Sequence, residues 1–83
     1  MYYVYVLKSV KQNYLYIGST DDLKHRFTEH NSGTQKATKA YVPFKLIYYE
    51  AYISKHASLI REKALKHHGG TIAALKRRLK DSF

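Results

Sequence analysis

The chain has 83 residues, 45% of them hydrophobic, and carries 15 lysine and arginine side chains against six acidic ones, a formal net charge of +9. This length predicts one domain over residues 1–83 with room for a single site, and the apolar content argues against disorder. The absence of cysteine excludes disulfides and thiolate-bound metals, and no uncharged apolar run approaches a membrane span, so we expect a cytoplasmic protein.

Two strand-like runs open the chain. Residues 2–9 are β-branched and aromatic without a breaker, and a second run over residues 14–17 ends at Gly18. The polar turn 11–13 between them predicts an antiparallel hairpin. Because both faces of the hairpin are apolar, we expect a sheet that helices cover on each side.

The first predicted helix runs from about residue 21 to 30, with Ser19 or Thr20 as its N-cap. Leu23 and Phe27 lie one turn apart and form its buried stripe. A parallel row beside that stripe carries an arginine and a histidine, which therefore border the core and point the same way. Taken alone, such an arginine is a solvated helix residue, and such a histidine packs or caps.

The second half of the chain predicts one strand and two helices. Pro43 ends a polar segment and admits the strand, and Gly69 and Gly70 are predicted to stop the helix that follows it. The predicted bounds are residues 44–53 for the strand and 55–67 and 72–80 for the helices, with Ser54 and Thr71 as N-caps. The positions predicted to face the core are Ala57, Ile60, Ala64 and Leu65, then Ile72, Leu75 and Leu79. The fold class is α+β, a three-stranded antiparallel sheet flanked by helices in the order β-β-α-β-α-α.

Basic residues gather in two stretches. No acid lies between Glu29 and Glu50, and the last helix is strongly basic. Such an excess favours a polyanionic partner through counterion release, with nucleic acid the first candidate. The alternative is a basic protein without such a partner. The residues predicted to bind nucleic acid are Lys36, Lys39, Lys45, Lys76, Arg77 and Arg78.

The aromatic runs also carry a recognisable pattern. Tyr3-Val4-Tyr5, followed after ten residues by Tyr16-Ile17-Gly18, resembles the paired signature of the GIY-YIG nuclease superfamily. Arg26 follows eight residues after the second motif, and Glu62 lies in a later helix, as in that family. The chain looks most like the small stand-alone members related to the nuclease domain of the excinuclease C subunit. The resemblance covers nearly the whole chain.

The resemblance implies roles for four residues. Tyr5 acts as general base on water, and Tyr16 lies against the same phosphate. A free phenol titrates near pH 10, so reaching the phenolate at pH 7 costs roughly 4 kcal/mol unless neighbours lower it. Arg26 and His30 are suitable residue types for lowering the cost of ionising Tyr5, because an arginine stabilises phosphoryl charge and a base takes the phenolic proton. Most other tyrosines are expected to be core or sheet-surface residues.

Glu62 is the predicted metal ligand. The family holds a divalent metal, Mg²⁺ or Mn²⁺, with one glutamate on this helix, and one carboxylate with waters and substrate phosphate suits magnesium. Alternatively, Glu62 pairs with a neighbouring base, namely Arg61, Lys63 or Lys66. Glu50 at the end of the last strand is the rival carboxylate.

The chain departs from the family pattern at three places. Tyr3 stands where the first motif has glycine, which adds bulk. Ala73 and Ala74 stand where several family nucleases carry an asparagine, and Ser19 and Thr20 where some carry a lysine.

The resemblance thus implies a metal-dependent endonuclease that hydrolyses phosphodiester bonds in nucleic acid, with DNA expected before RNA, in repair or processing of branched or damaged DNA. A partner protein that supplies specificity, and the oligomeric state, stay open. The alternative is a weak or inactive module that binds nucleic acid, because aromatic residues on a small sheet also serve stacking on single strands. We predict that the five site residues converge on one concave surface, and a position of Glu62 on the opposite face of the sheet from Tyr5 would contradict this interpretation of the site.

Overall fold

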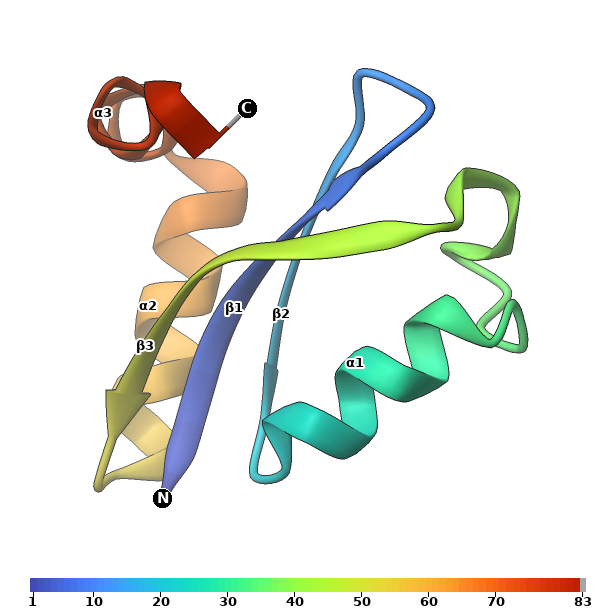
Figure 1. The fold of residues 1–83 in the computed structure, drawn as a ribbon. Helices are drawn as coiled ribbons and strands as arrows, with labels where there is room; N and C mark the ends of the chain where they lie inside the picture. The colour runs from blue at the N-terminus through green and yellow to red at the C-terminus, as the bar shows by residue number, and fades with distance from the viewer. Residues whose placement is uncertain (83) are drawn as a thin grey trace.

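A computed structural model describes residues 1–82 and contains three strands and three α-helices in the predicted order β-β-α-β-α-α (Figure 1). The strands are β1 Tyr2–Ser9, β2 Leu15–Thr20 and β3 Phe44–Tyr52, and the helices are α1 Leu23–Asn31, α2 Lys55–His67 and α3 Gly69–Arg78. Two short 3-10 helices, η1 Lys39–Tyr41 and η2 Lys80–Ser82, complete the described chain. None of the helices within residues 1–82 has the length and apolar character to cross a membrane.

The sheet is antiparallel with the strand order β2-β1-β3, so the first strand is the central one. In this register Tyr5 lies opposite Gly18 on β2 and opposite Tyr49 on β3. An irregularity between Val6 and Leu7 shifts the pairing of β1 with β3. Both β2 and β3 are therefore edge strands, and Gly18 lies on an edge.

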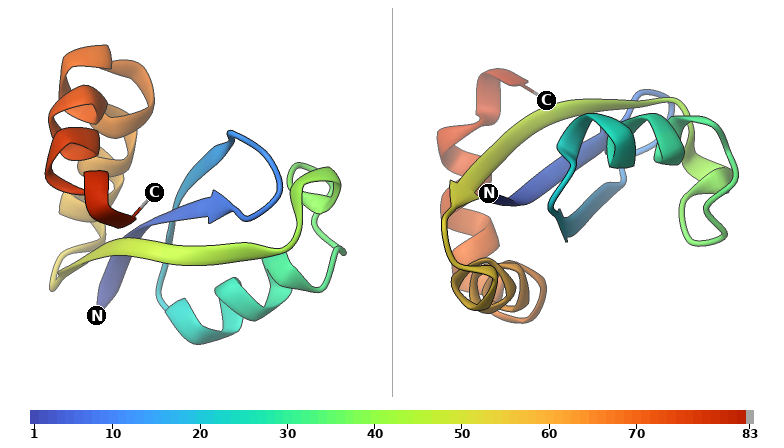
Figure 2. Two further views of the ribbon diagram at one scale, coloured as in Figure 1. Left: turned by 45° about the horizontal axis from the view of Figure 1, so that its top comes forward. Right: turned by 90° about the horizontal axis from the view of Figure 1, so that it is seen from below.

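Helices cover both faces of the sheet, as predicted. Figures 1 and 2 show α1 on one side of the sheet and α2 with α3 on the other. Val4 and Val6 pack with Leu65 of α2 and Leu75 of α3. The opposite face of β1 forms a second cluster that consists of Tyr5, Leu7 and Phe44 with Leu23 and Phe27 of α1. Because successive side chains of a strand point to opposite faces, the apolar run of β1 serves both clusters.

The predicted start and N-cap of α1 are wrong. The helix begins at Leu23, and the Asp22 carboxylate accepts the backbone N–H of His25 at 3.1 Å. Neither Ser19 nor Thr20 is the cap, because β2 continues through both residues.

The predicted start of α3 is also wrong. The helix begins at Gly69 rather than Ile72, with His68 at the N-cap in an extended conformation (φ −115°, ψ 97°). Gly70 is therefore in the first turn of the helix, and Thr71 does not cap it. A single non-helical residue is enough to separate α2 from α3.

One predicted core residue of α2 faces solvent. Ile60 is 57% exposed, whereas Ser58 is 1% exposed and lies with Leu65 on the inner face. Ser58 tolerates burial because its hydroxyl donates to the Lys55 carbonyl at 2.7 Å.

Candidate active site

Tyr5 and Gly18 face each other at the centre of the site. The Tyr5 side chain is 2% exposed and lies over Gly18. A Cβ atom on Gly18 would come within 2.5 Å of the Tyr5 Oη and 3.1 Å of the Tyr16 Cε2. Protein atoms do not approach that closely, so the phenol occupies the space that a side chain at position 18 would need. This contact explains the glycine of the second motif.

His30 and Thr38 continue from Tyr5 as a buried hydrogen-bonded chain. The Tyr5 Oη lies 3.0 Å from His30 Nε2, and His30 Nδ1 lies 3.0 Å from Thr38 Oγ1. His30 is 2% exposed and Thr38 is fully buried. Tyr16 packs beside them, with its ring centroid 4.6 Å from that of His30. Two tyrosines of adjacent strands and one histidine of α1 thus meet on the α1 face of the sheet.

Burial sets the protonation states of this chain. Burial, followed by the neighbouring Tyr16, raises the pKa of Tyr5, and Arg26 opposes the shift. Burial, followed by Arg26, lowers the pKa of His30. Both groups are therefore neutral at pH 7. A phenol is a better donor than an aliphatic hydroxyl, so we assign the Tyr5 O–H as donor to Nε2 and the Nδ1–H of His30 as donor to Thr38.

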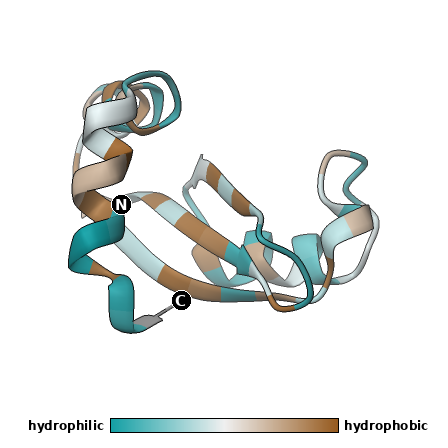
Figure 3. Ribbon diagram, turned by 90° about the horizontal axis from the view of Figure 1, so that it is seen from above, coloured by the Kyte–Doolittle hydropathy of each residue, from teal (hydrophilic) through white to brown (hydrophobic). Residues whose placement is uncertain are grey.

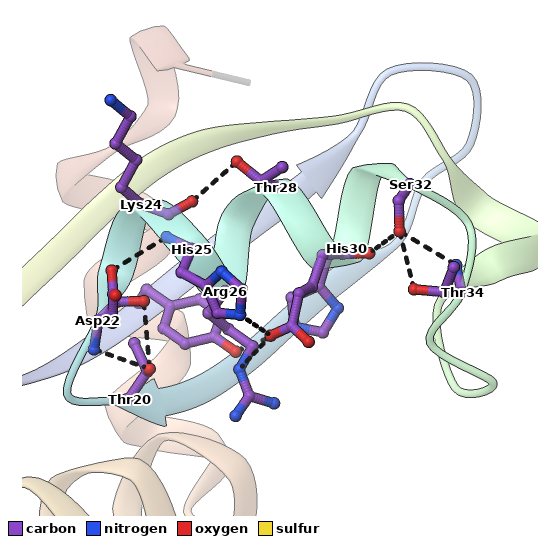
Figure 4. Close-up of polar contacts among 11 residues, drawn as sticks. Thr20, Asp22, Lys24, His25, Arg26, Thr28, His30, Ser32 and Thr34 are labelled. Carbon is purple, nitrogen blue, oxygen red and sulfur yellow. Dashed lines mark hydrogen bonds and ion pairs between the residues drawn. The ribbon is translucent and has the colours of Figure 1, made fainter.

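Arg26 lies on the same side of α1 as His30. Figure 4 shows both side chains on the side of the helix opposite to Lys24 and Thr28. The Arg26 Nε lies 3.4 Å from the Glu29 carboxylate, and the arginine side chain is 41% exposed. Because its charge affects the pKa of both Tyr5 and His30, Arg26 places a cation at the open rim of the site.

Glu62 reaches the site from the other face of the sheet. Its Oε1 accepts the Ser19 hydroxyl at 2.5 Å, and its Oε2 accepts Lys66 Nζ at 2.6 Å. Ser19 lies opposite Val4 and therefore on the α2 side, one residue from Gly18 on the edge strand. Glu62 therefore lies on the opposite face of the sheet from Tyr5, and the prediction that the five site residues share one surface is wrong. Glu62 approaches the α1-side residues only at the edge strand β2, where its charge still raises the pKa of Tyr5.

The rival carboxylate, Glu50, is tied into the scaffold. Arg61 donates to it through Nε at 2.9 Å and Nη2 at 3.0 Å, and the Tyr48 and Tyr52 hydroxyls each donate at 2.5 Å. Burial alone would raise the pKa of Glu50, but these hydrogen bonds outweigh it and hold the pKa below its ordinary value. Glu50 therefore links β3 to α2, and both of its oxygens are engaged.

The donor set around Glu62 limits the kind of metal that fits. Within residues 1–82 no group of three or more histidine, cysteine or acidic side chains is placed to hold an ion. Mg²⁺ and similar hard cations usually keep several waters and take one or two carboxylates plus substrate phosphates. The Glu62 carboxylate and the adjacent Ser19 hydroxyl fit that requirement.

The six predicted nucleic-acid residues are all exposed but lie in two groups. The 36–45 group is Lys36, Lys39 and Lys45, and the α3 group is Lys76, Arg77 and Arg78. The segment that leads from α1 to β3 and the helix α3 lie at opposite ends of the molecule (Figures 1 and 2), and the last turns of α3 are strongly hydrophilic (Figure 3). Only the α3 group shares a described cavity with the site, because Tyr16, Lys66 and Lys76 line a cavity of about 370 Å³.

A larger cavity lies elsewhere. It measures about 530 Å³ and is lined mainly by Tyr3, Phe27 and Tyr49 with the acids Asp21 and Asp22. None of the predicted site residues lines it, and its carboxylates disfavour a polyanion. The bulky Tyr3 of the first motif is accommodated here, with its ring edge against Tyr49 at a centroid distance of 6.1 Å.

Two contacts of the site escaped prediction. Thr38 lies in a polar segment, eight residues beyond His30, and Ser19 contacts a glutamate 43 residues away. Lys66 was predicted only as one of three alternative partners for Glu62, and the structure selects it.

Comparison with known proteins gives a consistent family assignment. Residues 1–77 match the model of the GIY-YIG catalytic domain. A UPF0213 protein of Streptococcus pyogenes serotype M3 is 43% identical over 65 residues, which cover 77% of this chain and 70% of the relative. A UPF0213 protein of Streptococcus pneumoniae serotype 4 is also 43% identical over 65 residues, with 77% and 65% of the two chains covered.

A solved structure agrees. The solution NMR structure of a UPF0213 protein from Bacillus halodurans superposes with a TM-score of 0.55 at 32% identity, covering 92% of this chain and 86% of the other. Its fold supports the same assignment as the sequence relatives. The chain therefore belongs to the GIY-YIG catalytic domain family, a family of nucleases.

Proposed function

We propose that this chain is a divalent-metal-dependent endonuclease that hydrolyses phosphodiester bonds, with branched or damaged DNA preferred over RNA. The observation that carries the proposal is the buried 3.0 Å hydrogen bond between Tyr5 Oη and His30 Nε2. Any buried phenol needs a hydrogen-bond partner, but here the partner is a neutral imidazole that can also take up the phenolic proton, and Thr38 holds that imidazole in turn.

The hydrogen-bonded chain of Tyr5, His30 and Thr38 avoids a free phenolate. Ionising an ordinary tyrosine at pH 7 costs roughly 4 kcal/mol, and the raised pKa of Tyr5 makes that cost larger. His30 Nε2 instead accepts the phenolic proton while the Tyr5 oxygen takes a proton from the attacking water. The water oxygen forms its bond to phosphorus, the bond from phosphorus to the leaving oxygen breaks, and the leaving oxygen takes a proton from solvent. The Nδ1 proton of His30 stays on the Thr38 side throughout.

The other residues stabilise charge on the phosphate. Arg26, at the open rim, binds the phosphoryl oxygens, and the Tyr16 hydroxyl donates to the same group. Glu62 and Ser19 would hold the divalent cation, which when bound supplies Lewis-acid stabilisation of the developing negative charge.

A second function has one specific observation in its favour. Both Glu62 oxygens already have partners, Ser19 and Lys66, so a metal must replace one of these contacts or share an oxygen with it. A chain in which that replacement fails would bind nucleic acid through its basic surface without cutting it.

A cleavage assay separates the two functions. Single-stranded, nicked and branched DNA and the matching RNA are incubated with the protein in Mg²⁺, in Mn²⁺ and in a chelator. We expect metal-dependent cleavage of DNA that falls by about 10²- to 10⁴-fold in Tyr5→Phe and in His30→Gln. Salt-sensitive binding with no cleavage of any substrate would support the binding module instead.

A further inference from the structure

Lys66 lies between the predicted metal ligand and the predicted phosphate site. Its Nζ is 2.6 Å from Glu62 Oε2 and 6.0 Å from the centroid of the Tyr16 ring. Its side chain is 38% exposed, that of Glu62 only 19%, and Lys66 lines the 370 Å³ cavity together with Tyr16. One flexible lysine therefore reaches both the carboxylate and the cavity.

Lys66 and a divalent cation compete for the same carboxylate. In the described chain Lys66 is the one base within ion-pair distance of Glu62. Two positive charges on one carboxylate repel each other at such short range, and the partial exposure of Lys66 keeps this repulsion modest. The face of Tyr16 attracts the same ammonium group, which already lies 6.0 Å from the ring centroid, so the lysine does not depend on Glu62 alone.

We propose that Lys66 is a substrate-binding residue that pairs with Glu62 in the metal-free protein and turns to a phosphate of the nucleic acid once a divalent cation takes the carboxylate. This inference rests on the proposed metal role of Glu62. A lysine suits the task because it is a mobile point charge with a flexible stem. The phosphate it binds lies in the cavity beside Tyr16.

The arrangement couples two binding events. The metal frees Lys66 for the nucleic acid, and the nucleic acid, by engaging Lys66, frees Glu62 for the metal. Such coupling is reciprocal by thermodynamic necessity, so each ligand raises the affinity for the other by one common factor. Removal of the Lys66 charge abolishes this part of the coupling.

The test compares Lys66→Met with Lys63→Met. Lys63 is exposed on the same helix, next to Glu62 in sequence, and its loss changes the net charge equally. Mn²⁺ affinity of the protein without nucleic acid is measured by electron paramagnetic resonance. Affinity for a labelled DNA oligonucleotide is measured with chelator and with Mn²⁺ in a Tyr5→Phe background that prevents cleavage, at one ionic strength.

We expect Lys66→Met to bind Mn²⁺ about two- to fivefold more tightly than Lys63→Met, the size of effect typical of an exposed ion pair. We also expect the gain in DNA affinity on adding Mn²⁺ to shrink in Lys66→Met and to persist in Lys63→Met. Equal Mn²⁺ affinities, or an unchanged gain in Lys66→Met, would overturn the inference while leaving the metal site intact. If the Glu62→Gln variant binds Mn²⁺ with the affinity of the wild type, both the metal role of Glu62 and the inference are overturned.

Discussion

Gly18 has no room for a side chain, because the Tyr5 hydroxyl lies 2.5 Å from the position that its Cβ would take. We expect Gly18→Ala to lose about 1–3 kcal/mol of unfolding free energy, the usual cost of overpacking, and to lose cleavage because the phenol is displaced from His30. Gly70→Ala is the matched control, since no neighbouring atom lies within 4 Å of the position that its Cβ would take. That variant should gain up to about 1 kcal/mol, because alanine is the better helix residue. Thermal unfolding of both proteins checks the pair, and equal melting temperatures would contradict the crowding at Gly18.

His30 makes stability depend on pH in a defined window. Its pKa in the folded protein is lowered, so between that value and the ordinary 6.5 the unfolded chain binds more protons than the folded one. Stability therefore rises with pH through this window and is lost as pH falls from 6.5 toward the lowered pKa. We expect a slope of at most about 1.4 kcal/mol per pH unit, and a flatter profile in His30→Gln. Denaturant titrations from pH 7.5 to 5 measure it. The carboxylates with lowered pKa values act in a separate window, below 4.5.

Single residues differ in how far the sequence identifies them. Tyr5, Tyr16 and Arg26 were predicted because their spacing along the chain carries the family pattern. Thr38 was not, because its role depends on how a polar segment without regular periodicity folds back on α1. Ser19 was first interpreted as a helix cap, since its position after Gly18 does not reveal that β2 continues far enough to bring it to Glu62.

The two glutamates of the second half play different parts in joining elements. Glu50 connects β3 to α2 through Arg61, whereas Glu62 connects α2 to β2 through Ser19. We expect Glu50→Gln to lose about 1–3 kcal/mol of unfolding free energy, because it weakens charged, half-buried hydrogen bonds. The folded molecules of this variant should cleave at the wild-type rate. Glu62→Gln should lose less than about 1 kcal/mol, since its partner lysine is exposed, yet lose cleavage by orders of magnitude.

Unfolding and cleavage are measured on both glutamine variants under the same conditions. The two substitutions remove the same charge and keep the same shape, so each is the control for the other. Full activity in folded Glu62→Gln would contradict the proposed metal role of Glu62. Lost activity in folded Glu50→Gln would mean that Glu50 belongs to the active site.

Elements were predicted well where hydrophobic periodicity was strong and less well where tertiary packing overrode it. The bounds of β1 and α2 were predicted correctly, and β3 ends within one residue of its prediction. Ile60 was assigned to the core because it is apolar, but helix geometry turns the row of Ser58 and Leu65 inward instead. Gly69 and Gly70 were predicted to end a helix because glycine has a low helix propensity. They instead form the first turn of α3, whose Leu75 packs into the core.

At the scale of the whole molecule, the decisive unknown was the order of the strands. The hairpin pattern predicts that β1 and β2 pair, but it does not say on which side β3 adds. The observed order places β2, and with it Gly18, on an edge, so residues from both faces of the sheet meet there. It also places the two basic groups at opposite ends, although the sequence indicates only that both are rich in lysine and arginine.

The separation of the basic groups predicts unequal roles in binding. Lys76 of the α3 group lines the same cavity as Tyr16, whereas the described cavities that contain site residues do not include the 36–45 group. Each phosphate contact contributes about −0.9 to the slope of log affinity against log salt on duplex DNA and about −0.7 on single strands. We therefore expect alanine at all three positions of the α3 group to flatten that slope by about 2. Alanine at all three positions of the 36–45 group, which removes the same charge, should change the slope less.

Fluorescence anisotropy over a series of salt concentrations measures both variants beside the wild type. Equal changes in the two variants would mean that nucleic acid responds to net charge alone and does not follow the cavity from Tyr16 toward α3.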